Sequence, residues 1–193
     1  IVFGVNDSEL DNSDVIVSLV KEADENNVAL TVFPELSITG YTCADLFHQS
    51  VLIDSTSSSI RMIAEATKNT TVIFVVGAPV YYRNKLYNCG VVIQSGRILG
   101  VVPKVFNPNY REFYEKRWFA SAKGLKNDSV KINKEVVPFG TNLIFEYDRY
   151  FSFAVELCED LWTVIPPSSY HAIAGATVCI NLSASNELVA KSE

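Results

Sequence analysis

The sequence lacks several features that would assign it to common classes of protein. No apolar run approaches the roughly 18–20 residues needed to span a bilayer, so no membrane helix is expected. Basic residues are outnumbered by acidic ones, 16 against 22, and the net charge of -6 argues against nucleic acid or an anionic membrane as the main partner. With 48% hydrophobic and 20% charged residues, the chain has the composition of one globular domain.

Cysteine and histidine are also scarce. The four cysteines are far apart, which disfavours a zinc site, and they are too few for a disulfide scaffold. We therefore expect reduced thiols, no metal site and a cytoplasmic location. A Cys-His or Ser-His-Asp hydrolase would need His48 or His171, and both are predicted to be structural. No Gly-x-Ser-x-Gly elbow is present.

Apolar residues alternate between helical and strand spacing, which predicts an α/β protein with helices covering the sheets. Two strand pairs flanking Ser95-Gly96 and Asp148-Arg149 are predicted to be hairpins. The second strand is expected to end at Gly77-Ala78-Pro79, and residues 103–142 show no clean period and are predicted to be a long loop. The expected helices are residues 12–26, 57–68 and 166–175, and the expected strands are 28–33, 72–76, 86–94, 97–102, 143–147, 150–157 and 177–182.

Three chemically useful residues stand just beyond apolar strands, where α/β folds place their sites. They are Glu35, Lys104 and Cys158. Each has an ordinary structural explanation when taken alone: a surface or capping acid, a solvated lysine and a small buried hydrophobe. Their shared position favours a site without proving one.

The segments around these residues carry a resemblance to a known superfamily. Residues 33–41 (FPELSITGY) resemble the nitrilase, or carbon–nitrogen hydrolase, signature around its catalytic glutamate. Val102-Pro103-Lys104 is similar to the lysine motif of that superfamily, and residues 156–160 (ELCED) to its cysteine motif. The order Glu, Lys, Cys agrees as well.

Longer segments narrow the resemblance to the glutaminase domain of glutamine-dependent NAD synthetases. They are residues 108–119, 158–162 and 181–187. Asn107 departs from the family pattern, where leucine is usual, and so does Ala154, where a glycine precedes the cysteine motif. The resemblance implies a nitrilase-like four-layer α-β-β-α sandwich, incomplete at both ends, with residues 1–193 forming part of the glutaminase domain. An ATP-dependent synthetase domain is expected C-terminal to Glu193.

The resemblance also implies a chemistry that these residue types can perform. Cys158 would attack an amide and form a thioester, with Glu35 as general base and Lys104 stabilising the oxyanion. Glu112 or Glu115 would orient Lys104, because a buried ammonium needs paired acceptors. Neither acid is preferred by the sequence.

The same resemblance implies substrates and partners. Contacts to glutamine are expected from Tyr110, Glu159, Ser185 and Lys191. No cofactor is expected for the glutaminase step, whereas deamido-NAD, ATP and Mg²⁺ would bind the synthetase domain, and a homo-oligomer is expected. The alternatives are a stand-alone amidase acting on another small amide and a non-catalytic module.

Overall fold

A computed structural model describes residues 9–185, with side chains from Asn12 onward. The helical elements are α1 (Glu9–Glu25), η1 (Ala44–His48), α2 (Ser50–Ala66), α3 (Glu115–Trp118), η2 (Cys158–Trp162) and α4 (Pro167–Ile173). The strands are β1 (Leu30–Val32), β2 (Ile73–Tyr82), β3 (Lys85–Gln94), β4 (Arg97–Pro103), β5 (Asp128–Ile132), β6 (Glu135–Phe139), β7 (Ile144–Glu146), β8 (Ser152–Leu157) and β9 (Val178–Leu182).

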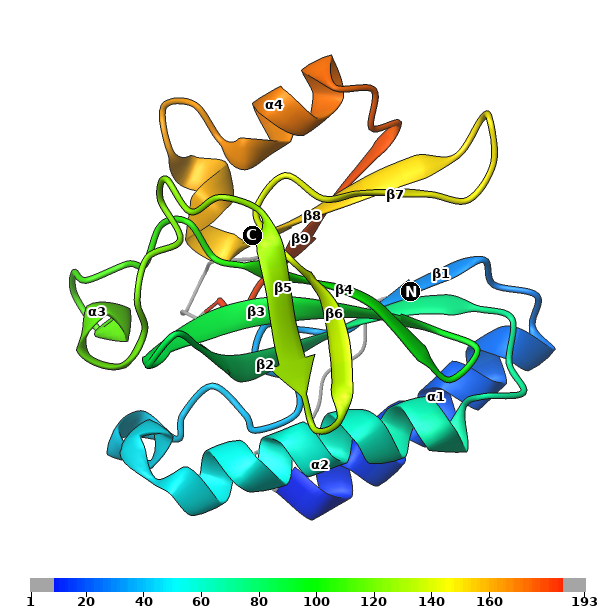
Figure 1. Ribbon diagram of the computed structural model, residues 1–193, viewed down its shortest axis with the longest axis horizontal. Coiled ribbons are helices and arrows are strands. Elements are labelled where there is room, and N and C mark those ends of the chain that lie inside the picture. Colours follow the sequence, from blue (N-terminus) through cyan, green and yellow to red (C-terminus); the bar gives the residue numbers. More distant parts are fainter. Residues whose placement is uncertain (1–8, 186–193) are drawn as a thin grey trace, which may run out of the picture.

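Two sheets form the middle of the molecule (Figure 1). The larger sheet has the strand order β1-β2-β3-β4-β6-β5, and the smaller has the order β7-β8-β9. Helices α1 and α2 cover the outer face of the larger sheet, and α4 lies on the smaller one (Figure 1). The α-β-β-α layering implied by the sequence is thereby confirmed.

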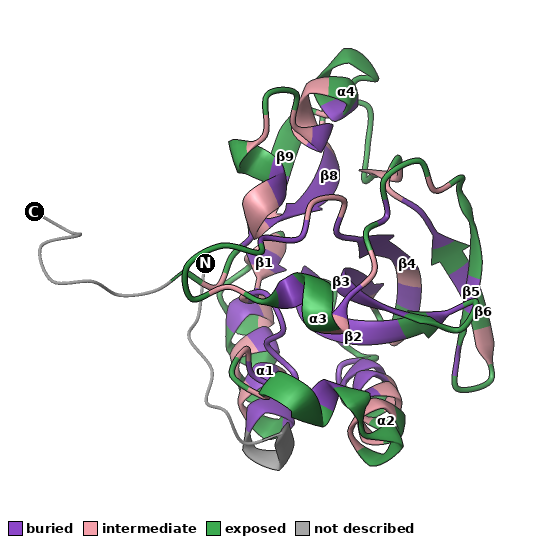
Figure 2. Cartoon of the chain, turned by 90° about the vertical axis from the view of Figure 1, so that its left-hand side faces the viewer, coloured by how far each residue is buried: buried purple, intermediate pink, exposed green. Residues whose placement is uncertain are grey.

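Alternating side chains of β2 serve two different cores. Phe74, Val76 and Ala78 pack toward α1 and α2, whereas Ile73 and Val75 face the smaller sheet. This is the two-residue period of a strand that is covered on both faces. Figure 2 shows the resulting burial along β2, β3, β4 and β8. The strand ends are consequently held between two packed layers.

Each of the helices α1 and α2 buries one face, whose apolar residues recur at helical spacing. Ile16, Val20 and Ala23 of α1 are in the core, as are Ile60 and Ile63 of α2. Both helices begin earlier than the sequence predicted, and α2 begins at residue 50 rather than 57. Both predicted hairpins are present, joining β3 to β4 and β7 to β8.

The prediction that the second strand ends at Gly77-Ala78-Pro79 is wrong. β2 continues to Tyr82, and Pro79 lies opposite Asn88 of β3. Proline is tolerated here because β1 pairs only with residues 73–75, so the missing N–H of Pro79 is not needed by a second neighbouring strand.

The prediction of a long loop over residues 103–142 is also wrong in part. The segment contains α3 and the hairpin of β5 and β6, which extends the larger sheet. Val130, Ile132, Val137 and Phe139 are the buried side chains of this hairpin. Charged residues and a proline stand between them, which obscured the alternating pattern.

Gly77 allows the segment that carries Glu35 to lie directly on β2. A Cβ at position 77 would stand 2.2 Å from the Leu36 nitrogen and 2.6 Å from the Pro34 oxygen. Two hydrogen bonds fasten the segment there, because Gly77 donates its N–H to Ser37 Oγ at 3.0 Å and its carbonyl accepts the Ile38 N–H at 3.1 Å. The backbone at Glu35 is therefore placed by close contact with β2.

The described residues also bear on the expectations about membrane helices and cysteines. None of the helices in residues 9–185 is long and apolar enough to cross a membrane. Cys43, Cys89, Cys158 and Cys179, which are all within this range, are free thiols.

Replacing Gly77 by Ala should destabilise the protein, because the methyl group meets backbone atoms that have no rotamer with which to move aside. We expect a loss of about 3 kcal/mol in the free energy of unfolding, the upper end for overpacking, measured by denaturant titration. Gly100→Ala is the matched control, because its Cβ would meet only side-chain atoms of Leu143 and Phe145 at 3.1 Å. Equal losses in the two variants would contradict the backbone-contact explanation.

Candidate active site

The three residues selected from the sequence meet at adjoining strand ends. Glu35 follows β1, Lys104 directly follows β4 and Cys158 directly follows β8. The strands β1 and β4 belong to the larger sheet, and β8 belongs to the smaller one. The site therefore spans the contact between the sheets, and the predicted positions at strand ends are confirmed.

A fully buried ammonium group lies at the centre of the site. Lys104 is 0% exposed, and its Nζ donates to Glu35 Oε1 at 2.6 Å and to Glu115 Oε1 at 2.7 Å. Both carboxylates are buried as well. The sequence left Glu112 and Glu115 as alternatives for supporting the lysine, and the structure places Glu115, the first residue of α3, in that contact.

Two further side chains, which the sequence motifs did not single out, join this network. Asn88 of β3 donates from Nδ2 to Glu35 Oε1 at 2.8 Å. The backbone carbonyl of Asn88 accepts the backbone N–H of Lys104 at 2.8 Å. Tyr41 donates its hydroxyl to Glu115 Oε1 at 2.7 Å. Both residues lie within segments that the sequence analysis discussed, but only their tertiary contacts indicate a role.

Burial and neighbouring charges shift the pKa values of this network. Burial raises the pKa of Glu35, and the Glu115 charge adds to the rise despite the opposing effects of Lys104 and Asn88. Burial alone would lower the pKa of Lys104, but the two carboxylates outweigh it and hold that pKa above its ordinary value. Burial, reinforced by Glu115, also raises the pKa of Tyr41, which remains a neutral donor. Lys104 is thus a permanent cation beside a carboxylate of raised basicity.

Cys158 is held in a sharp turn at the end of β8. Its φ of 42° is unusual for a non-glycine residue and is typical of strained functional positions. Ser183 Oγ lies 3.3 Å from its sulfur, and the Ala184 N–H, which donates to Glu35 Oε2 at 3.2 Å, lowers the pKa of the thiol. Burial, then the Glu35 charge, raises the thiol pKa, whereas Lys104 lowers it. The thiol, the carboxylate and the ammonium thus act on one another.

The expected glutamine-contacting residues lie beside this centre as far as they are described. Tyr110 donates its hydroxyl to Glu159 Oε2 at 2.7 Å, and both residues line a surface cleft of about 640 Å³. Ser185 is exposed and follows Ala184, whose N–H contacts Glu35. Lys191 lies outside the described residues.

Neither histidine takes part in this site. His171 is buried on α4, where its Nε2 lies 2.8 Å from the Thr141 carbonyl oxygen, and His48 is exposed at the end of η1. Among residues 9–185, no group of three or more metal-ligating side chains is close enough to hold an ion.

Comparisons with known proteins agree with this geometry. A family model for carbon-nitrogen hydrolases matches residues 7–189. A glutamine-dependent NAD(+) synthetase from Mycobacterium tuberculosis is 38% identical over 184 residues, which cover 94% of this chain and 27% of that protein. The chain therefore spans about a quarter of the length of this relative.

Solved structures show the same fold. The crystal structure of a glutamine-dependent NAD(+) synthetase from Cytophaga hutchinsonii superposes with a TM-score of 0.81 at 28% identity, covering 97% of this chain and 30% of that one. An amidase from Nesterenkonia sp. AN1 superposes with a TM-score of 0.67 at 17% identity, covering 95% of this chain and 63% of that one. The second likeness concerns the fold alone.

Replacing Lys104 by Met should strongly destabilise the protein, because Glu35 and Glu115 would lose their buried cation. We expect a loss of about 3–5 kcal/mol near pH 8. Without the ammonium the folded-state pKa of Glu35 rises further above its unfolded value, so folding favours its protonated form. The loss should therefore shrink toward about pH 5 and grow as the pH rises, measured by urea titration across that range.

Arg61→Met is the control for this variant. Arg61 pairs with Glu65 and Glu135 on the surface, with 42% of its side chain exposed, so its loss should cost about 0–1 kcal/mol. A Lys104→Met loss of the same size, or one that does not depend on pH, would mean that the buried network contributes little to folding.

Proposed function

The chain belongs to the carbon–nitrogen hydrolase family, and from this premise we propose that it hydrolyses the side-chain amide of glutamine through a thioester on Cys158. In the whole protein, the ammonia released would serve the ATP-dependent amidation of deamido-NAD to NAD by a synthetase domain C-terminal to the residues given. The likeness to glutamine-dependent NAD(+) synthetases supports this extension of the proposal.

One observation carries the proposal: a thiol, a carboxylate and an ammonium meet where strand ends of the two sheets adjoin. The Ala184 N–H donates to Glu35 Oε2 and lowers the pKa of the Cys158 thiol, so one backbone N–H acts on both the base and the nucleophile. Lys104 contacts Glu35 directly and influences the pKa of the thiol. An amide hydrolase needs these three groups together, because an amide is a poor electrophile with a poor leaving group.

In the first half of the reaction, Glu35 takes the proton of the Cys158 thiol and the sulfur attacks the carbonyl carbon of the amide. Of the three N–H donors of Lys104, two are used by Glu35 and Glu115, which leaves one for the developing oxyanion. Collapse of the tetrahedral intermediate breaks the C–N bond. Glu35 returns its proton to the nitrogen, and ammonia leaves behind a thioester.

In the second half, water replaces the departed ammonia. Glu35 takes a proton from this water while the water oxygen attacks the thioester carbonyl carbon. Lys104 again stabilises the oxyanion. Breakage of the C–S bond releases glutamate and returns the proton to Cys158. The raised pKa of Glu35 suits both halves, because the same carboxylate has to accept and return a proton near neutral pH.

For substrate recognition, we propose that Tyr110, Glu159, Ser185 and Lys191 contact glutamine. The bond between Tyr110 and Glu159 supports the first two, because an acid near the thiol can receive the α-ammonium group. The glutaminase step itself needs no cofactor in this scheme. ATP, Mg²⁺ and deamido-NAD belong to the synthetase domain, and the free thiols agree with the proposed cytoplasmic location.

Replacing Cys158 by Ala in the full-length protein should abolish glutamine-dependent NAD synthesis, because no thioester can form. Synthesis from free ammonia should continue at the wild-type rate, and coupled NAD assays with either nitrogen source measure both activities. Cys179→Ala is the matched control: this exposed thiol on β9 is outside the network and its loss should change neither activity. Glutamine-dependent turnover by Cys158→Ala would remove this residue from the mechanism.

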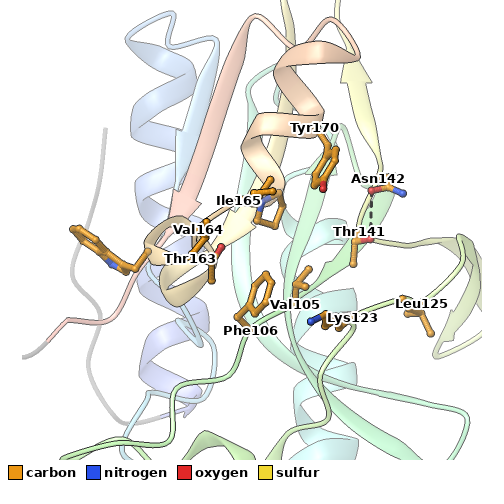
Figure 3. A pocket seen from close by; sticks show the side chains of 13 residues that line it. Val105, Phe106, Lys123, Leu125, Thr141, Asn142, Thr163, Val164, Ile165 and Tyr170 are labelled. Atoms are coloured by element: carbon orange, nitrogen blue, oxygen red, sulfur yellow. Dashed lines mark hydrogen bonds between the residues drawn. The ribbon is translucent and has the colours of Figure 1, made fainter.

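An exposed apolar surface supports the proposed homo-oligomer. It comprises η2, α4 and the loop between them, and we refer to it as the η2–α4 surface. A hollow of about 790 Å³ opens beside it, where Phe106, Ile165 and Tyr170 face the same space (Figure 3). Its exposed apolar residues are Leu161, Trp162, Val164, Ile165, Tyr170 and Ile173. Apolar residues gathered in this way are typical of protein interfaces, and we propose a second copy as the partner.

Replacing Val164 by Asp should weaken self-association, because Val164 is fully exposed in the single chain and a charge would be buried in the assembly. We expect a smaller mass by light scattering at a concentration where the full-length wild type is oligomeric. Val136→Asp is the control, since Val136 is 67% exposed on β6, away from the η2–α4 surface. A monomeric wild type, or an unchanged mass for Val164→Asp, would contradict the proposal.

A further inference from the structure

Asp160 joins two segments that enter the site from different sheets. Its side chain is buried, and Oδ1 accepts the Phe106 N–H at 2.7 Å and the Val105 N–H at 3.1 Å. Oδ2 accepts the Leu157 N–H at 3.1 Å. One carboxylate therefore holds three backbone donors, and none of them belongs to the reacting groups themselves.

The three donors are immediate neighbours of the nucleophile and the cation. Val105 and Phe106 follow Lys104 at the end of β4, and Leu157 precedes Cys158 at the end of β8. The two sheets meet mainly through apolar side chains such as Val102 and Val155. Apolar packing fixes the separation of layers but does not direct one strand end toward another, whereas hydrogen bonds do so.

The bond to Leu157 also closes the turn in which Cys158 lies. Leu157 and Asp160 flank Cys158 and Glu159, and the backbone at Cys158 is strained, with a φ of 42°. A strained residue keeps its conformation only when its surroundings hold it there. A simple helix-capping role for Asp160 would explain the bond to Leu157 but not the two bonds to the segment after Lys104.

We propose that Asp160 is a positioning residue that sets the distance between the Lys104 ammonium and the Cys158 thiol by holding both strand ends. The expected effect of Asp160 on catalysis rests on the function proposed above. Its consequence for the thiol does not depend on the substrate. The charged groups that act on the thiol are Glu35, which raises its pKa, and Lys104, which lowers it, so the thiol pKa reports where these groups lie.

Asp160→Asn in the full-length protein is the test. An amide has one acceptor oxygen, so either the segment after Lys104 or the turn at Cys158 loses its acceptor, whichever way the amide is turned. The rate of Cys158 alkylation by iodoacetamide, followed by peptide mass spectrometry from about pH 8 to 10.5, gives the thiol pKa. Burial raises the pKa of Asp160 to about 7, so Asp160 is ionised in the wild type over this range.

The direction of the change distinguishes position from charge. If Asp160 positions the lysine, the thiol pKa rises by about one unit in Asp160→Asn, because the ammonium stabilises the thiolate less. kcat/KM for glutamine falls at least tenfold, mainly through kcat, while NAD synthesis from free ammonia is unchanged. If Asp160 acts only through its negative charge, removing the charge lowers the thiol pKa, and a fall or no change overturns the proposal.

A control and a second variant complete the design. Asp128→Asn should leave the thiol pKa unchanged. Asp128 also accepts several hydrogen bonds, but its donors are Tyr82 at the end of β2, Arg83 in the turn that follows, and Ser129 of β5. If Asp160→Asn does not fold, Asp160→Glu must show the same rise, since it retains the charge but displaces both acceptor oxygens. A wild-type thiol pKa in a folded Asp160→Glu overturns the proposal. A wild type that does not hydrolyse glutamine, together with a raised thiol pKa in the variant, refutes the proposed function and leaves the positioning role standing.

Discussion

The buried ammonium of Lys104 is the interaction on which the rest of the site depends. It is fully buried and lies between Glu35 and Glu115, so two negative charges share one positive charge away from water. Removing a charge from water costs several kcal/mol, which is recovered only when the partners are close and well directed. Asn88, Tyr41 and the Ala184 N–H supply further donors to these carboxylates. The polarity that the chemistry needs is thus held in place by a buried network whose charges also affect the stability of the fold.

The elements that could be predicted are those whose buried residues recur at a regular spacing in the sequence because they contact a single neighbouring layer. The faces of α1 and α2 were found because residues such as Val20 and Ile63 recur at helical spacing against one sheet. Pro79 does not mark the end of β2, because a proline can lie inside a strand where one edge of that strand lacks a partner. The hairpin at residues 128–139 was missed because only alternate residues are buried, and the exposed ones are mostly charged or polar, with a proline and the apolar Val136 among them.

The site divides in the same way between local and tertiary information. Glu35, Lys104 and Cys158 could be selected because each follows an apolar strand within a recognisable motif. The choice of Glu115 over Glu112 depends on where α3 lies against the lysine, which no local pattern encodes. Asp160 is two residues from Cys158, yet two of the N–H groups that donate to it lie more than 50 positions earlier in the chain. Residues that react can be recognised by their type, whereas residues that hold them are recognised by their partners.

The contact at Gly77 has a consequence for how such a site can change. The backbone of the segment carrying Glu35 rests against β2 without room for a methyl group. The distance between the strand and this segment is therefore fixed by direct backbone contact. Redesign of the cleft beside Tyr110 can draw on positions where side chains face solvent. The wall behind the carboxylate offers no such freedom, and a search for altered specificity would treat residue 77 and residues 34–38 as fixed scaffold.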